Sequence, residues 1–429
     1  MISLKTEWNI LTLLVTFALP VSPVLAVSIE TVLVGNPHNA PDHDYFAPGN
    51  VLQQGPNDGG RGSVAYNYEI GKYLVTNAQY AEFLNAVASE DAHLLYNTAM
   101  NSAIYGGITR SGTSGNYSYT LKPNMAHKPI TQVNFWDAAR FTNWLHNGQP
   151  TGAQDDTTTE DGVYTLGGVT VPDNLSVFRN VGAKWFLPNE DEWYKAAFHQ
   201  PASQGGDSDD YWMFPTASNV QPITATADSV GNISNPGSNV ASYQGTANWN
   251  GSTNGNLTTV GSAGPLSESY YGTADMAGNA WDWLETIVYT SVNVRDEDGR
   301  RVWGAGHDNN PTNFRADHNV HHFVATEDRR NLGFRVARYA QEALFAGDFD
   351  LDDDVDENDL TDPTLGWSAR YGIDLDGSDF LNWQRQFGSS DVPQTSSATV
   401  VPEPSSSLLL IGLVTVAGRF LYRDIGGLG

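Results

Sequence analysis

The sequence predicts an α+β fold that is irregular and rich in loops. Three segments between residues 27 and 340 combine a helix N-terminal cap with an apolar stripe at helical spacing. The rest of that region is rich in glycine, asparagine, serine and threonine, which favour turns and loops. The chain has 429 residues, of which 42 are glycine and 21 proline, while 12 tryptophans and 19 tyrosines supply a core.

The three predicted helices share one N-terminal signal, a capping residue with a partner three positions on. These pairs are Thr76 and Gln79, Asn134 and Asp137, and Asn189 and Glu192. The apolar spacing predicts which side chains each helix buries. They are Tyr80, Phe83, Leu84 and Val87 in the first helix, Phe141, Trp144 and Leu145 in the second, and Trp193, Ala196 and Ala197 in the third.

Charge and cysteine content exclude several classes of function. The net charge of -27 repels phosphate backbones, so nucleic acid is not expected as a partner and divalent cations are favoured. The chain contains no cysteine, which excludes disulfides, thiolate metal sites and cysteine nucleophiles together. Stability must therefore come from packing, with or without bound metals.

The N-terminal residues 1–26 have the pattern of a secretory signal peptide. An apolar run from Asn9 to Leu19 is followed by Pro20 and Pro23 and then by small residues ending at Ala26. Cleavage by signal peptidase is expected after Ala26. The alternative is a buried core helix, which the position at the start of the chain disfavours.

The C-terminal residues 401–424 combine three elements in order. They are a Pro402-Glu403-Pro404 box, an apolar stretch from Leu408 to Gly418, and a basic end with Arg419 and Arg423. This order resembles the PEP-CTERM sorting signal, which implies processing by an exosortase. The resemblance implies export to the periplasm, cell surface or exterior of a Gram-negative-type bacterium. A plain tail anchor is the alternative, but the stretch is short of the roughly 20 residues of a membrane span.

Residues 341–390 form an acidic segment, and a linker over 391–400 joins it to the sorting signal. Six aspartates have the spacing of positions 1, 3, 5, 7, 9 and 12 of a calcium loop. They are Asp348, Asp350, Asp352, Asp354, Asp356 and Asp359. Asp353 stands where such a loop normally has glycine, and a second half around Asp379 is degenerate. The segment resembles a dockerin type I module of EF-hand-like form, which implies a cohesin-like partner. A solvated acidic spacer is the alternative.

Five ordered segments of the middle region carry a further resemblance. They read YEIGKYLVTNAQYAEFLNAV from Tyr68, PITQVNFWDAARFTNWL from Pro129, AKWFLPNEDEWYKAA from Ala183, YGTADMAGNAWDW from Tyr271 and NLGFRVAR from Asn331. This succession resembles the formylglycine-generating enzyme, or sulfatase-modifying factor, family over residues 27–340. The resemblance implies a compact, irregular α+β fold related to C-type lectins.

Catalytic members of that family hold copper with two cysteines. Asn309 and the pair Thr312 and Asn313 lie about where those thiols would be. Because neither residue type is a soft copper ligand or a redox thiol, formylglycine generation is disfavoured and copper is not expected. The resemblance alone leaves enzymatic activity open, but the missing cysteines disfavour it.

The resemblance also implies a structural calcium site. Its ligands would be the side chains of Asp275 and Asp282 and the carbonyls of Gly278 and Ala280. Asp282 replaces the family's usual glutamate, which shortens the reach by one methylene. The alternative is that Asp275 and Asp282 only stabilise turns.

Four residues near the expected cleft are candidates for a ligand pocket: His307, Asn309, Arg315 and Arg335. Arg335 is equally expected as a salt-bridge partner in the core. His307, His318, His321 and His322 are candidates for a transition-metal site, although ordinary loop histidines are the favoured interpretation. Three functions fit these features. The favoured function is a calcium-stabilised extracellular binding module for a carbohydrate or a peptide. The alternatives are a divergent metal-dependent oxidoreductase or protein-modifying enzyme in the same cleft, and a surface scaffold that acts through the dockerin-like segment.

Overall fold

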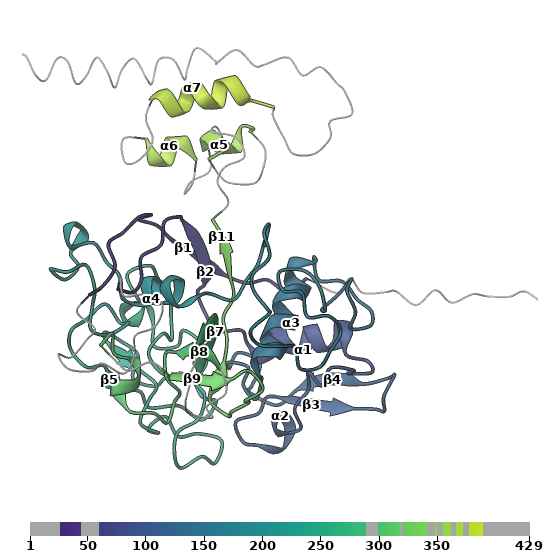
Figure 1. Cartoon of the computed structure of the whole chain (residues 1–429). Coiled ribbons are helices and arrows are strands. Elements are labelled where there is room, and N and C mark those ends of the chain that lie inside the picture. Colours follow the sequence, from purple (N-terminus) through teal and green to yellow (C-terminus); the bar gives the residue numbers. More distant parts are fainter. Residues whose placement is uncertain are drawn as a thin grey trace, which may run out of the picture. The chain divides into compact units, whose positions relative to one another are not determined.

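The computed structural model describes residues 26–43, 60–288, 299–317, 321–340, 348–349, 355–361, 366–371 and 377–388. The chain divides into two compact units, residues 1–339 and 340–429, and each is described by itself (Figure 1). The expected signal peptide up to residue 25, the linker and the sorting signal lie outside the described residues. Within the described ranges, none of the helices has the length and apolar character that a membrane crossing requires.

Three helices of the first unit confirm the predicted caps. They are α1 (Asn77–Val87), α3 (Phe135–His146) and α4 (Glu190–Phe198). Each begins with the expected capping box, in which the cap side chain and its partner three residues on bond each other's backbone N–H. The side chains predicted to be buried are buried in all three helices. A short helix, α2 (Ala99–Ser102), follows α1.

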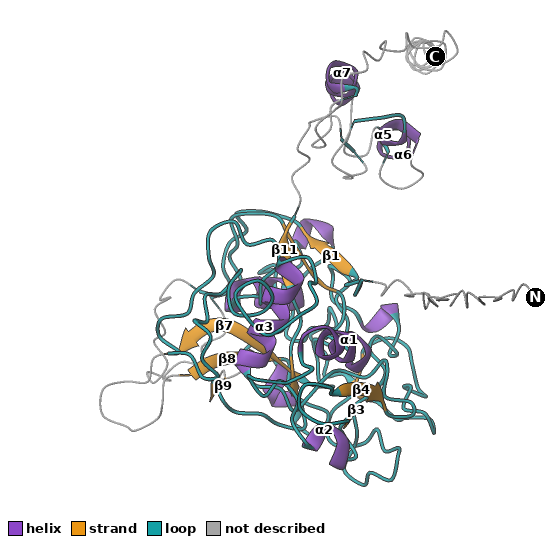
Figure 2. Ribbon diagram, turned by 90° about the vertical axis from the view of Figure 1, so that its right-hand side faces the viewer, coloured by secondary structure: helices purple, strands orange, loops and turns teal. Residues whose placement is uncertain are grey.

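The strands among the described residues are short and form four small sheets (Figure 2). Their bounds are β1 Thr31–Val34, β2 Tyr68–Gly71, β3 Ile108–Ser111, β4 Ser118–Leu121, β5 Ile223–Thr224, β6 Val240–Ala241, β7 Trp281–Val288, β8 Gly299–Trp303, β9 His321–Val324, β10 Leu332–Gly333 and β11 Ala337–Tyr339. The sheet orders are β1-β2-β11, β10-β7-β8-β9, β3-β4 and β5-β6. The β10–β7 and β5–β6 pairs are parallel and the others are antiparallel.

One large aromatic core joins the helices to the sheet of β7, β8 and β9. Trp193 of α4 stacks on Trp303 of β8 with ring centroids 5.5 Å apart. On the other side, Phe141 of α3 contacts Phe83 of α1 and Phe334, each at 5.3 Å. The segment between α4 and β7 is mostly loop, with three-residue 3₁₀ turns at Ala202–Gln204 and Pro265–Ser267. This is the loop-rich α+β fold that the sequence predicts.

The described residues of the second unit form three short helices. They are α5 (Asn358–Thr361), α6 (Trp367–Arg370) and α7 (Gly377–Gln386). Trp383 of α7 donates its indole N–H to the carbonyl of Asp356 at 2.6 Å, and Gly388 N donates to the carbonyl of Val355 at 2.7 Å. These two bonds hold α7 against the chain before α5.

Candidate functional site

Asn309 occupies the first position at which a thiol is expected, two residues before the 3₁₀ turn Pro311–Phe314. Its Oδ1 accepts hydrogen bonds from Trp281 Nε1 and from the backbone N–H of Gly306, both at 2.8 Å. Its carbonyl accepts from the N–H of Gln244 at 2.9 Å. The amide is thus an acceptor that ties β7 and two loops together.

Asn313, at the second expected thiol position, faces His321 on β9. Its Nδ2 lies 3.0 Å from His321 Nε2, within hydrogen-bonding distance. The His321 ring packs edge-on against Trp281 with centroids 5.1 Å apart, and burial lowers the pKa of His321. Trp281 therefore contacts Asn309 itself and the His321 ring that faces Asn313.

His307 lies two residues before Asn309 in the interior. It is 1% exposed, and neither ring nitrogen has a hydrogen-bond partner among the described residues. Its ring stacks on Tyr105 at 5.2 Å, and Arg330 covers the Tyr105 ring at 5.3 Å while pairing with Asp308 at 2.7 Å. Burial lowers the pKa of His307 to about 4, so the imidazole is neutral at physiological pH.

The histidines of this region do not form a metal cluster in the part of the chain that the structure describes, where no group of three or more His, Asp or Glu side chains converges. His318, which the sequence offers as a further ligand, lies outside the described residues. His322 is on β9 beside His321, so the two side chains leave opposite faces of the strand.

Arg335 and Asp282 form an ion pair in the core. Arg335 Nε lies 3.0 Å from Asp282 Oδ2, and both side chains are fully buried. The remaining donors of the guanidinium bond backbone carbonyls, including that of Ala274 at 3.2 Å. Arg315, in contrast, pairs with Asp317 and is more than a third exposed. Of the two arginines considered for a ligand pocket, Arg335 lies in the core and Arg315 on the surface.

The expected calcium ligands are held in different ways. Asp275 is half-buried, accepts from Gly261 N at 2.7 Å, and has its pKa raised to about 6, chiefly by desolvation. A cavity of about 10 Å³ adjoins it, which is room for one water molecule or ion. Asp282 Oδ2 is bonded by Arg335 and Trp193, but its Oδ1 is buried with no partner among the described residues. Asp282 thus keeps one anionic oxygen available to a cation.

The backbone near Gly278 is held by its neighbours. Gly278 N donates to the carbonyl of Gly304 at 2.6 Å, and Asn279 N donates to that of Ser242 at 2.8 Å. Ser242 Oγ and Thr258 Oγ1, on the two loops that bond Asn279, are also buried without partners among the described residues. Since buried polar atoms are normally satisfied, these orphans fit a bound ion or water near residues 275–282.

Comparison with known proteins decides the family. Residues 36–340 match the family described as Sulfatase-modifying factor enzyme 1-like domain. This chain belongs to that family. Residues 400–423 match the PEP-CTERM protein-sorting motif, which indicates an exported protein that an exosortase processes. No curated protein matches the chain.

Solved structures resemble this sulfatase-modifying-factor domain at low identity. CarF is 18% identical with a TM-score of 0.42, covering 73% of this chain and 99% of its own. Treponema denticola variable protein 1 is 14% identical with a TM-score of 0.40, covering 74% and 98%. PvdO from Pseudomonas aeruginosa is 15% identical with a TM-score of 0.34, covering 73% and 92%.

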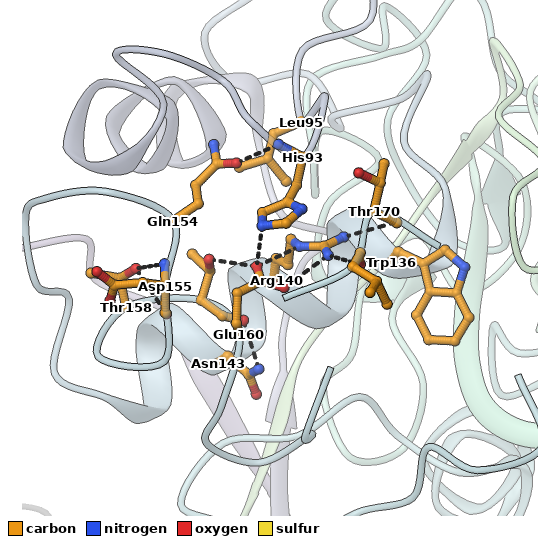
Figure 3. A network of polar contacts seen from close by, with 12 residues as sticks. His93, Leu95, Trp136, Arg140, Asn143, Gln154, Asp155, Thr158, Glu160 and Thr170 are labelled. Carbon is orange, nitrogen blue, oxygen red and sulfur yellow. Dashed lines mark hydrogen bonds and ion pairs between the residues drawn. The ribbon is translucent and has the colours of Figure 1, made fainter. Parts of the chain in front are cut away.

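The sulfatase-modifying-factor domain also contains a buried polar network that the sequence did not reveal (Figure 3). Arg140 of α3 bonds both carboxylate oxygens of Glu160, at 2.7 and 2.9 Å, with neither side chain exposed. His93 Nε2 lies 3.6 Å from the same carboxylate. Trp281 was missed as well, although its indole N–H made a polar partner necessary.

The predicted calcium loop of the second unit is described only in part. Asp350, Asp352 and Asp354 lie outside the described residues, while Asp348, Asp356 and Asp359 lie within them. The Asp359 carboxylate accepts from the N–H of Phe349 and, at 2.7 Å, from the N–H of Asp356. Asp359, the last position of the loop, therefore bonds the backbone both near the first position and at the ninth.

Proposed function

We propose that the sulfatase-modifying-factor domain of this exported chain is a non-catalytic binding module. The observation that carries the proposal is the use of Asn309 as a hydrogen-bond acceptor for Trp281 and Gly306. A redox or copper-binding centre needs soft, deprotonatable ligands, whereas this amide is engaged in holding the fold together. The family scaffold is thus retained while its thiol positions serve stability.

The ligand would be a carbohydrate or a peptide, bound in a cavity of about 350 Å³. This volume suits a small ligand, and the lining combines the aromatic face of Tyr73 with the polar groups of Glu30, Gln79 and His127. Aromatic faces and adjacent hydrogen-bonding groups are the features that bind sugar rings. None of His307, Asn309, Arg315 or Arg335 lines this cavity.

Titration calorimetry with a panel of neutral oligosaccharides and short peptides tests the ligand proposal. Replacing the half-buried Tyr73 in Tyr73→Ala removes the aromatic wall and should lower affinity at least tenfold. Tyr270→Ala removes a tyrosine that is 38% exposed and lines none of the three cavities described, so it is the matched control. Equal affinity of both variants would place the ligand elsewhere and reject this cavity.

We further propose that calcium stabilises this domain through Asp275, Asp282 and the carbonyls of Gly278 and Ala280. The unpartnered, buried Oδ1 of Asp282 and the desolvation that raises the pKa of both carboxylates support the proposal. When bound, calcium would supply the positive charge that lets Asp275 stay ionised. Melting in calcium and in chelator tests it: the melting temperature should fall in chelator for the wild type but little for Asp275→Asn. Chelator-insensitive melting of the wild type would reject the calcium site.

For the second unit, we propose that residues 341–390 bind calcium through the loop from Asp348 to Asp359 and dock a cohesin-like protein. The support is the position of Asp359, whose carboxylate bonds the backbone N–H of Phe349 near the start of the loop and that of Asp356 at its ninth position. Deleting residues 341–391 should abolish capture of a cohesin domain in a pull-down with calcium. Capture that survives the deletion, or that is unchanged by chelator, would contradict the docking role.

Elemental analysis of the purified chain separates the binding module from the alternative of a divergent metal-dependent oxidoreductase. If the domain is a non-catalytic binding module, calcium should be the only metal that the analysis finds in stoichiometric amount. Stoichiometric iron or copper would favour the oxidoreductase and count against the proposal.

A further inference from the structure

One loop of the first unit, residues 167–182, turns large apolar side chains toward solvent. Its exposed large apolar residues are Val169 (50%), Val171 (58%), Leu175 (40%), Phe178 (57%) and Val181 (fully exposed). Single exposed apolar side chains are ordinary on a soluble protein, but five within thirteen positions form an unusual concentration. We call residues 167–182 the apolar loop.

The apolar loop is fastened to the body of the domain at its first half by Arg140. The guanidinium, paired with Glu160, also donates to the carbonyls of Val169 at 2.7 Å and Thr170 at 3.4 Å (Figure 3). Arg140 and Glu160 are completely buried. Burying a charged pair costs desolvation, so this anchor is a built feature rather than a chance surface contact.

A second buried arginine fastens the other half of the apolar loop. Arg300 of β8 is 1% exposed and donates to Asn174 Oδ1 at 2.7 Å and to the carbonyls of Asn174 and Val177 at 2.9 Å. Val177 points inward and is 3% exposed, whereas its neighbour Phe178 points outward. Asn180 adds a third anchor, because its N–H donates to the carbonyl of Val163 at 2.8 Å.

These hydrogen bonds fix the loop backbone on its buried side, while the apolar side chains face solvent. A loop that is already ordered loses little conformational entropy when a partner binds to it. Rigid backbone and exposed aliphatic and aromatic side chains are the two properties of a preorganised docking surface. A loop whose apolar groups only filled the core would point them the other way.

The charges around the apolar loop restrict the partner. Asp173 lies within the loop, and Asp161 is held beside it because Thr165 bonds both Asp161 at 2.9 Å and Asn180 at 3.1 Å. Both aspartates are exposed, and Lys184 is the one exposed base between residues 149 and 184. With a net charge of -27, a second copy of this chain would be repelled. Positive charge on the partner would be attracted.

We propose that the apolar loop docks a protein partner whose contact element carries apolar side chains flanked by lysine or arginine. The apolar side chains of that element would pack on Val171, Phe178 and their neighbours. Its basic groups would face Asp161 and Asp173. This surface is separate from the proposed ligand cavity, none of whose lining residues belongs to the apolar loop.

Binding of designed peptides to the full-length chain tests the proposal. The probe is a fluorescently labelled amphipathic peptide of leucine and lysine, about 18 residues long, and the control probe has glutamate in place of lysine. The loop variant is Val171→Ser/Phe178→Ser. The matched control is Val220→Ser/Leu266→Ser, which alters two exposed apolar residues outside the loop, each 69% exposed. Melting temperatures establish that both variants fold, since surface substitutions of this kind change stability by about 0.5 kcal/mol or less.

The proposal predicts that the lysine peptide binds the wild type and the control variant equally and the loop variant at least tenfold more weakly. The glutamate peptide should not bind. Equal binding to wild type and loop variant, or no binding of the lysine peptide, would overturn it. Two other occupants would also overturn it. One is a second copy, seen as wild-type dimers in sedimentation that the loop variant lacks. The other is a lipid surface, seen as loop-dependent binding to phosphatidylcholine vesicles.

Discussion

Trp281 donates its indole N–H to Asn309 Oδ1 at 2.8 Å, at the first of the two positions where a sulfatase-modifying-factor catalyst would need a thiol. The same oxygen accepts from the N–H of Gly306. Asn309 thus holds the start of β7 to the loop that follows β8. Losing that acceptor leaves two donors unpaired in a partly buried site.

Asn309→Ala should therefore destabilise the chain by about 1–3 kcal/mol in urea denaturation, since a buried unpaired donor costs about that much. Asn309→Asp keeps the acceptor oxygen and should cost less. Asn310→Ala, one residue on, changes an exposed asparagine whose side chain makes no capping bond, and it should leave stability unchanged. Equal losses for Asn309→Ala and Asn310→Ala would show that the Asn309 amide does not hold this turn.

His307→Phe should remove a pH dependence. The pKa of His307 in the folded chain is about 4, below the roughly 6.5 of an unfolded chain, so the unfolded state takes up the proton first as the pH falls. Stability contributed by the neutral ring is present above pH 6.5 and is lost as the pH falls toward 4, by about 3 kcal/mol in all. His199, whose pKa is also lowered to about 4, titrates in both proteins and cancels in the comparison.

The measurement is the free energy of unfolding of wild type and His307→Phe at several pH values between 7 and 4. The free energy of unfolding of the variant should rise relative to that of the wild type as the pH falls, because phenylalanine retains the stacking on Tyr105 and takes up no proton. A constant difference between the two proteins across this range would mean that the ring nitrogens are satisfied in solution.

Arg335→Met and Asp282→Asn should each lose about 3–5 kcal/mol, because each leaves an unpaired charge in the core. The double variant should lose much less than the sum, since it removes both charges and keeps an amide oxygen for Trp193. Thermal or urea unfolding of the three variants gives the coupling energy. Additive losses would show that the two residues act independently.

Glu160→Gln should loosen the apolar loop. The substitution removes the charge that Arg140 faces in the buried network, at a cost of about 3 kcal/mol or more. Because Arg140 also holds the carbonyls of Val169 and Thr170, limited proteolysis should cut within residues 167–182 faster than in the wild type. Asp161→Asn changes an exposed neighbour and should leave the cutting rate unaltered. Equal cutting rates in Glu160→Gln and the wild type would show that the Arg140–Glu160 pair does not hold the loop.

The helices of the first unit follow from local sequence, whereas its polar contacts do not. The sequence predicts the helices after Thr76, Asn134 and Asn189 because each cap and its partner are only three residues apart. Arg140 and Glu160, in contrast, are 20 residues apart, and Arg300 and Asn174 are 126 apart. Only the folded chain brings such pairs together, so no spacing in the sequence reveals them.

The candidate site was predicted in the same uneven way. The segment from Tyr271 contains Asp282, and Asn309 lies between that segment and the one from Asn331, but the local pattern does not name the residues that either contacts. The sequence offers Asp282 as a calcium ligand or a turn-stabilising residue and Arg335 as a pocket or core salt-bridge residue, and the structure pairs the two in the core. His307 was a pocket candidate, and the structure places it in the core against Tyr105.

The most direct test of the non-catalytic role is an oxidation assay. Purified full-length chain, loaded with copper and supplied with oxygen and reductant, is incubated with a sulfatase-type peptide containing cysteine, and the product is analysed by mass spectrometry. A thiol-containing family enzyme is the positive control. The cysteine of the peptide should remain unconverted, as in a sample without protein. Formylglycine formed in proportion to the amount of this chain would contradict the proposal that its thiol positions now serve only the fold.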